Sequence, residues 1–562
     1  MRRLFLVTVV LIGFAITPLA NGATVPDEQF VVQPPVPAGQ EFFGYTRAYL
    51  DESFALGTWS TLIGKNYQDN DPRKKEISGE ICSSLDAPNC KNVNGFQYYA
   101  TLDVCEKNSD TNCIEGLSAS IKNGPFIKGI VVEKTTPNFK YGFVGNSGQG
   151  VPNGATPALW KFDSIKHQGG DLFLLNVVAE KNSAGSGTLY PERLIAALQP
   201  ISKKIGSFTI PYAVGLKTPN AMGNVWGIDN GKFGECVRIL SETECALPWP
   251  HPDEIRYRLE LRVSKSANLS NFLHGRVVNP TVSLTSLNNN QFSMVIEAGP
   301  VSTPFINAWR KNTEISAELN KILDKQFYGG GGYEGNCTSA GRSSCNFIIP
   351  PIELNETGRE QYLLWLKEFG DKASGVKSMW SIRTLDQNAL TSTYGPTECI
   401  VNLKGMSGVV STNANVYVAG PPTFNSKTGT LDYKVSSPHF DAQGNVNKGS
   451  YDLAISEDLA RCIYGFSKAP IKAEVSVFGE NGEKKVATTT VLQRDGWIYL
   501  SAQGFEYSVP TLSVKLSQDK EIEVAPSIKP TSSSRVITCT KGKITKKVTG
   551  ANPKCPAGYK KK

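Results

Sequence analysis

Cysteine is the residue type whose number and spacing point most directly to chemistry in this chain of 562 residues. There are twelve cysteines, and the thiols of an exported chain oxidise to disulfides. Their order along the chain predicts six pairs: Cys82–Cys90, Cys105–Cys113, Cys236–Cys245, Cys337–Cys345, Cys399–Cys462 and Cys539–Cys555. Polar, turn-forming residues fill the short intervals, so each short pair is expected to close a loop between two antiparallel strands.

Thiolate coordination of zinc is the rival chemistry for cysteines that lie close together. Zinc sites favour two cysteines with about two to four residues between them. No two cysteines of this chain have that spacing. We therefore predict structural disulfides, no metal site and no cofactor.

Lysine gives the second pattern, because the positive charge is concentrated at the C-terminus. The chain contains 59 Lys and Arg residues and 51 Asp and Glu residues. Residues 525–562 hold ten of the basic residues and no acidic residue, and two more basic residues are the arginines next to Met1. The rest of the chain has 47 basic and 51 acidic residues. The excess of positive charge therefore belongs to the C-terminal tail.

A short cationic tail can bind anionic polymers, because the bound polymer releases its counterions into solution. The candidate binding residues are Lys541, Lys543, Lys546, Lys547, Lys554, Lys560, Lys561 and Lys562. A flexible, solubilising end is the usual role of a charged run and is the alternative. The cysteine pair in the same segment favours a fixed structure. The predicted partner is an anionic cell-envelope polymer or polysaccharide, and no nucleic acid is expected.

Catalytic motifs are missing from the sequence. There is no His-Glu-x-x-His, no Gly-x-Ser-x-Gly and no phosphate-binding loop. His167 and His274 could be site residues, although a histidine in such a setting more often makes one structural hydrogen bond. Trp249, in the segment PWPHP, is the candidate for an exposed platform that stacks sugars, because its prolines keep the segment out of strands. A glycosidase needs only two facing carboxylates, so an extracellular polysaccharide-acting hydrolase stays open, but no catalytic residue is predicted.

The elements that must position these residues follow an export signal. Two arginines precede an apolar run from Leu4 to Ile16, and small residues surround the expected cleavage site near Gly22. This order predicts a signal peptide over residues 1–22 and a secreted or cell-surface protein. The apolar run is shorter than the roughly 17–25 residues that span a bilayer, so no transmembrane anchor is expected after cleavage.

The remaining sequence predicts a mainly β fold, with several disulfide-stapled, sandwich-like antiparallel β-domains and a small helical insertion around residues 312–371. Runs such as YRLELRVS at 257–264 alternate between apolar and polar residues, as half-buried strands do. Helices are expected at 312–327 and at 357–369, where Thr357 and Glu360 form a capping box. Three β-rich domains are predicted: residues 23–200, residues 201–375 with the two helices, and residues 376–524 as a sandwich-like domain. Residues 525–562 are predicted to form a linker and a basic disulfide tail.

Three stretches carry a resemblance to known proteins: FLHGRVVNP at 272–280, LARCIYGFSKAP at 459–470 and ITCTKGKITKKVTGANPKCPAGYKKK at 537–562. They resemble large secreted actinobacterial proteins that have no assigned activity, and the tail is similar to a short Cys- and Lys-rich C-terminal module. The resemblance implies a cell-envelope setting and supplies no catalytic residue. We expect an exported binding or structural protein rather than an enzyme, with a stalk-like adhesin as a further alternative.

Overall fold

The computed structural model describes most of the chain after residue 42. The described residues are 43–47, 55–67, 76–108, 110–135, 142–183, 193–208, 235–264, 272–288, 290–328, 334–335, 347–349, 356–385, 399, 406–418, 420–466, 471–479, 484–485, 488–507, 511–518, 535–550 and 552–562. The chain divides into two compact units. The first spans Met1–Phe466 and Ala473–Leu516, and the second spans Ser467–Lys472 and Ser517–Lys562. Strands predominate in the described residues, which confirms the mainly β fold.

Eight strands of the first unit form a closed ring of antiparallel pairs. These strands are β5 (Cys113–Ile121), β6 (Ile127–Lys134), β7 (Ala158–Phe162), β8 (Leu172–Ser183), β9 (Arg193–Ile205), β12 (Ile255–Ser264), β14 (Gln291–Phe305) and β18 (Gly375–Thr384). The hydrogen-bonded order is β5-β12-β14-β18-β9-β8-β7-β6, and β6 returns to β5. The predicted domain boundaries at residues 200 and 375 fall within β9 and β18, both of which are ring strands.

Alternating side chains fill the interior of the ring. In β12 every second residue is buried, as the alternating sequence predicts. Aromatic rings from four strands meet edge to face: Phe162 and Phe173 lie 5.0 Å apart between ring centroids, and Tyr257 and Trp380 lie 6.1 Å apart. Such edge-on contacts are favourable because the positive ring edge faces the negative ring face. The ring is therefore a packed core.

Smaller groups of strands extend this framework. Their bounds are β1 (Phe43–Arg47), β2 (Thr61–Tyr67), β3 (Glu76–Ile81), β4 (Gly95–Thr101), β10 (Arg238–Ile239), β11 (Glu244–Pro248), β15 (Asn307–Lys311), β16 (Glu334–Gly335) and β17 (Phe347–Ile349). β4 pairs with β8 and continues through β2 to β3, while β11 pairs with β9 and β10. β1, β15, β16 and β17 form a separate sheet.

Strand β13 (Phe272–Ser286) pairs with three other strands. Its first residues pair with β18 and, in parallel, with β19 (Gly408–Thr412), whereas its later residues pair with β14. Two glycines permit this close packing. A Cβ on Gly408 would lie 2.0 Å from the Phe272 ring, and one on Gly275 would lie 2.4 Å from the carbonyl oxygen of Ser381. Larger residues at either position would separate the strands.

The C-terminal part of the first unit is the sandwich expected for this region. One sheet continues from β19 through β23 (Lys448–Ser456) and β27 (Trp497–Glu506) to β26 (Thr488–Arg494). The other sheet contains β20 (Val416–Tyr417), β21 (Thr423–Asn425), β22 (Thr430–Ser436), β24 (Ile471–Phe478), β25 (Lys484–Lys485) and β28 (Thr511–Gln518). The ring of Tyr433 on β22 lies 5.4 Å from that of Tyr451 on β23. The two sheets therefore face each other through buried side chains.

Three helices accompany the strands in the described residues. α1 (Ala317–Tyr328) and α2 (Glu356–Glu368) confirm the predicted helical insertion, and Leu319 and Trp365 join their apolar faces in one cluster. α5 (Glu457–Tyr464) was not predicted. It begins at Ser456, whose hydroxyl accepts the Leu459 N–H, and it ends at a left-handed glycine. None of the helices in the described part of the chain has the length and apolar content needed to cross a membrane.

Five of the six predicted disulfides are present: Cys82–Cys90, Cys105–Cys113, Cys236–Cys245, Cys399–Cys462 and Cys539–Cys555. Cys337 and Cys345 lie outside the described residues. No cysteine that the structure describes is free. Sequential pairing was predicted from spacing alone, and these five pairs confirm it.

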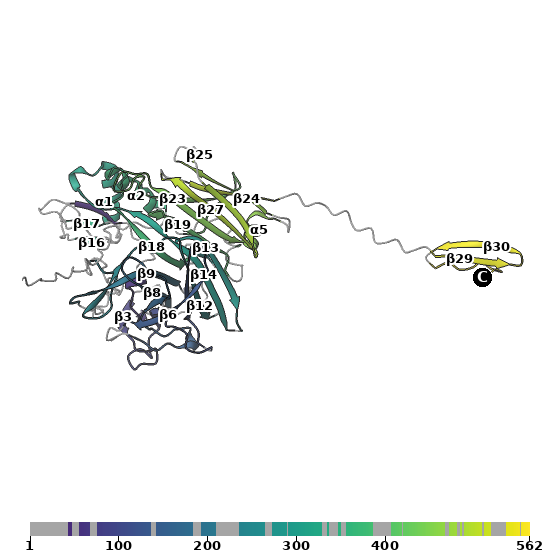
Figure 1. Cartoon of the computed structure of the whole chain (residues 1–562), viewed down its shortest axis with the longest axis horizontal. Coiled ribbons are helices and arrows are strands. Elements are labelled where there is room, and N and C mark those ends of the chain that lie inside the picture. Colours follow the sequence, from purple (N-terminus) through teal and green to yellow (C-terminus); the bar gives the residue numbers. More distant parts are fainter. Residues whose placement is uncertain are drawn as a thin grey trace, which may run out of the picture. The chain divides into compact units, whose positions relative to one another are not determined.

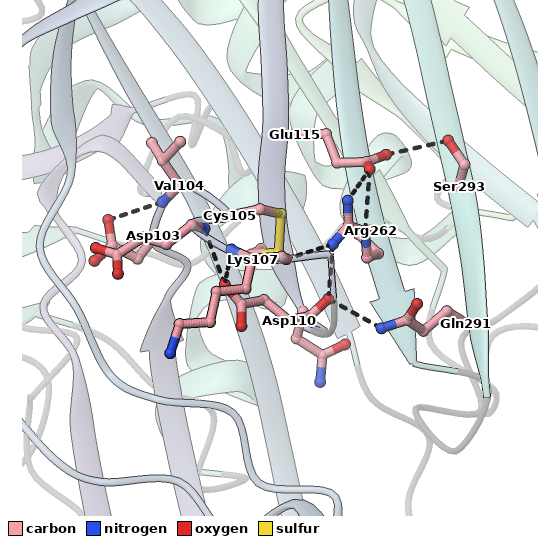
Figure 2. Close-up of a disulfide and its surroundings, with 12 residues drawn as sticks. Asp103, Val104, Cys105, Lys107, Asp110, Glu115, Arg262, Gln291 and Ser293 are labelled. Carbon is pink, nitrogen blue, oxygen red and sulfur yellow. Dashed lines mark hydrogen bonds and ion pairs between the residues drawn. A yellow bond between two sulfur atoms is a disulfide. The ribbon is translucent and has the colours of Figure 1, made fainter. Parts of the chain in front are cut away.

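The loop closed by Cys105–Cys113 is also held by polar contacts (Figure 2). The Asp110 carboxylate accepts the backbone N–H of Lys107 at 2.7 Å, and such bonds lower the pKa of this carboxyl group. Arg262 on β12 donates to the carbonyl oxygen of Lys107 at 2.8 Å and forms an ion pair with Glu115 on β5. Gln291 on β14 donates to the carbonyl oxygen of Asp110 at 3.1 Å, so contacts from two ring strands fix the loop in addition to its disulfide.

Removal of a disulfide is expected to destabilise the protein according to the length of the loop that it closes. Cys399 and Cys462 are 63 residues apart, and replacing both by alanine is expected to lower the free energy of unfolding by about 4 kcal/mol. Cys105 and Cys113 are 8 residues apart, and replacing both by alanine is expected to lower it by about 2.5 kcal/mol. The difference arises because a longer cross-linked loop removes more entropy from the unfolded chain. Equilibrium unfolding in denaturant measures both losses. An equal or larger loss for the short loop would contradict loop length as the main cause.

Candidate functional site

The basic tail folds as a three-stranded antiparallel sheet, which we call the tail sheet (Figure 1). It contains β29 (Arg535–Lys541), β30 (Ile544–Gly550) and β31 (Lys560–Lys561), with β29 in the centre. β29 and β30 form a hairpin whose two-residue turn begins at Gly542 with φ of 57°. Tight hairpin turns require such positive φ values, which glycine adopts without strain.

A disulfide replaces most of the hydrophobic core in this small sheet. Cys539 in the central strand is completely buried and bonds to Cys555. It is the only fully buried residue in the described part of the tail. So few residues cannot bury enough apolar surface to fold by that means alone, and covalent staples commonly compensate in such small folds. The tail sheet thus depends on Cys539–Cys555.

All eight predicted lysines are exposed on the tail sheet or its connections. Together with Arg535 they give nine basic residues within 535–562, and no acidic residue lies in this segment to form an ion pair with them. Register places Lys546 and Lys561 on either side of Cys539. Neighbouring strands lie about 4.8 Å apart, so these two lysines project from strands roughly 10 Å apart. The structure therefore brings the predicted residues together on one folded element.

The histidines singled out in the sequence are structural. His167 is buried, accepts the Gly169 N–H at 3.2 Å through Nδ1, and donates from Nε2 to the carbonyl oxygen of Leu172 at 3.0 Å. Burial lowers its pKa and favours this neutral form. His274 is completely buried on β13, where Arg383 donates to Nε2 and the Tyr417 hydroxyl contacts Nδ1 at 2.7 Å. Both rings serve packing and hydrogen bonding.

The prediction of an exposed sugar platform at Trp249 is wrong. Its side chain is only 3% exposed, and the indole N–H donates to the Ser202 hydroxyl at 2.9 Å. The ring lies directly against Gly169, where an added Cβ would be 2.0 Å from the indole nitrogen. The prolines do not keep this segment out of strands either: Pro248 is the last residue of β11 and pairs with Ile201, and the Trp249 N–H donates to the carbonyl oxygen of Pro200 at 2.9 Å.

Asp452 is the described carboxyl group whose environment most resembles that of a catalytic acid. Burial raises its pKa to about 6. Its partners are, however, the backbone N–H of Asn279 at 2.9 Å and the side-chain amide of Gln503 at 3.3 Å. Asn279 lies in the bulge of β13 with φ of 48°, so the carboxyl group holds a strained strand position. These contacts give Asp452 a structural role.

Protonation of the core histidines is expected to make the protein labile to acid. His251 is buried beside Tyr257, and desolvation lowers its pKa from 6.5 to about 3. As the pH falls below about 6.5 the unfolded chain therefore binds a proton that the folded chain does not, and stability is lost. Between pH 7.5 and pH 5 this histidine accounts for about 2 kcal/mol.

His251→Asn is expected to reduce the acid-induced loss of unfolding free energy by that amount, although the variant is less stable at pH 7.5. Denaturant unfolding of both proteins at the two pH values measures the difference, and His439→Asn, at a half-buried position in the sandwich, is the control. If wild type and His251→Asn lose the same free energy between pH 7.5 and pH 5, His251 does not cause the lability.

Comparison with known proteins adds no further assignment. No family model, no curated protein and no solved structure matches this chain. The likeness of the tail to a module of secreted actinobacterial proteins therefore stays a prediction. The function proposed below is therefore argued from the charge, the exposure and the strand register of the residues in the tail sheet.

Proposed function

We propose that this protein is exported and binds anionic polymers of the cell envelope through its tail sheet, and that the first unit is a rigid binding or structural body. The observation that carries this proposal is the presence of nine basic residues and no acidic residue on a disulfide-closed sheet. Five disulfides in the described residues agree with an oxidising compartment.

The spacing of the lysines suits a polyanion. At physiological salt the field of one charge is screened over about 8 Å, and neighbouring strands lie about 4.8 Å apart. Lysines on adjacent strands therefore act on the same segment of a bound polymer. Each contact releases a counterion, so affinity is expected to come from many weak contacts and to fall as the salt concentration rises.

The disulfide supports binding by fixing the lysines before the polymer arrives. A disordered lysine-rich segment loses backbone entropy when it binds, whereas a folded sheet has lost that entropy already. Folding also keeps the positive charges close together in spite of their mutual repulsion, because Cys539–Cys555 joins the central strand to the segment before β31. A fixed sheet therefore binds at a lower entropic cost than a flexible tail of the same composition.

Among the residues that the structure describes, the hydrolase alternative has no such support. The carboxyl group with the most perturbed surroundings, Asp452, is bonded to a backbone N–H and an amide rather than facing a second carboxyl group. A paired, solvent-accessible arrangement is what glycoside hydrolysis requires. Envelope binding is the function that the described residues favour.

Full-length protein is expected to bind isolated cell envelopes in a salt-dependent manner, whereas a protein that ends at Pro526 is expected to stay in solution. Cosedimentation between about 50 and 500 mM NaCl measures both, with the slope of log K against log salt as the readout. In the full-length chain, Lys546→Gln with Lys547→Gln is expected to reduce the steepness of that slope by about 1–2, because two neutralised charges are lost.

Lys91→Gln with Lys128→Gln removes the same charge from exposed positions of the first unit and is the matched control. We expect this control to bind as wild type does. Equal binding by the protein that ends at Pro526 would place the receptor site in the first unit. Absence of binding by every form would refute the envelope proposal.

A further inference from the structure

The two faces of the tail sheet carry different side chains. Successive residues of a strand point to opposite faces, and directly paired residues share a face. Cys539 shares its face with Lys546 and Lys561, which we call the disulfide face. The opposite side, the threonine face, takes the remaining strand positions: Val536, Thr538, Thr540, Thr545, Lys547, Thr549 and Lys560.

The segment before β31 lies over the disulfide face. Cys555 reaches Cys539 from that side, and a Cβ on Gly558 would lie 3.2 Å from Nζ of Lys541, which belongs to the same face. The lysines of the disulfide face therefore surround a covered centre. They remain exposed, but they do not frame a flat surface.

The threonine face is mostly polar: Val536 is its one exposed large apolar residue, and lysines stand on both outer strands. Register gives one row in which Thr545, Thr540 and Lys560 lie side by side, and a second row in which Lys547 lies beside Thr538. Thr545 and both lysines are exposed, and the other two threonines are half-buried in the central strand. Rows lie about 7 Å apart along the strands, and neighbours within a row about 4.8 Å apart. Each row thus places a hydroxyl group beside an ammonium group.

We infer that the threonine face is the contact face of the tail sheet and that its ligand is an acidic polysaccharide, an inference that rests on the proposed function. Lys547 and Lys560 bind carboxylates of the polymer, and the three threonine hydroxyls exchange hydrogen bonds with its ring hydroxyls. Each hydroxyl both donates and accepts, as sugar hydroxyls do. Thr540 Oγ1 contacts the Lys560 carbonyl oxygen at 3.4 Å, and its oxygen still accepts a bond from a ligand.

Other polyanions fit this surface less well. Single-stranded nucleic acid binding relies on aromatic stacking, and the one aromatic residue in the tail is Tyr559, which is half-buried. Insertion into a lipid surface needs an apolar patch, but the two exposed large apolar residues, Val536 and Ile544, lie on opposite faces. Threonine hydroxyls between lysines match a hydroxyl-bearing polymer instead.

The test replaces three hydroxyl groups and leaves shape and charge unchanged. Thr538→Val, Thr540→Val and Thr545→Val are combined in the full chain, because valine is close to threonine in shape and favours strands. The probes are polygalacturonate, which has carboxylates and hydroxyls, and polyacrylate, which has carboxylates only. We expect the variant to bind polygalacturonate about tenfold more weakly with an unchanged salt slope, since each lost hydrogen bond costs about twofold. Binding to polyacrylate is expected to stay within about twofold of wild type.

A matched pair of charge variants reports which face is used. Lys547→Gln with Lys560→Gln removes two charges from the threonine face, and Lys546→Gln with Lys561→Gln removes two from the disulfide face. The first pair is expected to weaken polygalacturonate binding at least threefold more than the second. Mass spectrometry of the Cys539–Cys555 disulfide checks that each variant keeps its fold.

Several outcomes would overturn the inference. The valine variant could bind polygalacturonate as tightly as wild type does, or it could lose as much affinity for polyacrylate as for polygalacturonate. Either result would show that the threonine hydroxyls do not recognise the sugar hydroxyls. If the valine variant lost affinity only for duplex DNA or only for phosphatidylglycerol vesicles, the ligand of the threonine face would be a nucleic acid or a lipid surface and not an acidic polysaccharide. In each of these cases the wild-type tail still binds polyanions and the proposed function stands, whereas failure of the wild type to bind any of the probes would remove the proposed function itself.

Discussion

The pairing of β13 with both the ring and the sandwich is the constraint on which the first unit depends. Its early residues hydrogen-bond to β18 and β19, and its later residues to β14, so β13 connects two ring strands to the first strand of the sandwich. Arg276, completely buried on this strand, donates to the carbonyl oxygens of Ala414 and Asn415 and lies 4.4 Å over the Tyr417 ring. A buried cation is costly unless such partners compensate it. These contacts join the start of the sandwich to β13.

Local patterns in the sequence predicted the parts of this fold that depend on neighbours along the chain. The alternation of β12, the apolar stripe of α2 and the short cysteine spacings all describe interactions within a few residues. The closure of the ring is different, because β5 pairs with β12 about 140 residues away. No periodicity specifies such a partner. The partners of β13 were equally difficult to predict. Its first six residues are all buried, so they show no alternation, and only its later part contains exposed positions.

The candidate site shows the same division between local and distant information. The lysines were identified from the position of the basic residues along the sequence, and the structure gathers them on one sheet. The threonines were missed, although Thr538 and Thr540 have the spacing of residues on one strand face. The pairing of Thr538 with Lys547 depends on the register that the turn at Gly542 sets, and the pairing of Thr540 with Lys560 depends on the separate register of β31. A slip of one residue would exchange the faces. The prediction for Trp249 failed for another reason: Pro248 lies in strand β11, and the proline content of a segment does not report burial.

The spacing of the disulfides also bears on the time course of folding. Ring pairs such as β5–β12 and β9–β18 join residues more than 100 positions apart, and chains dominated by such distant pairs fold slowly because the loops must close first. Cys82–Cys90, Cys105–Cys113 and Cys236–Cys245 bridge only 8 or 9 residues. These bonds can form while the rest of the chain is still open. Oxidation can therefore fix several turns before the last strands of the ring meet, which shortens the search that a slow-folding topology would otherwise require.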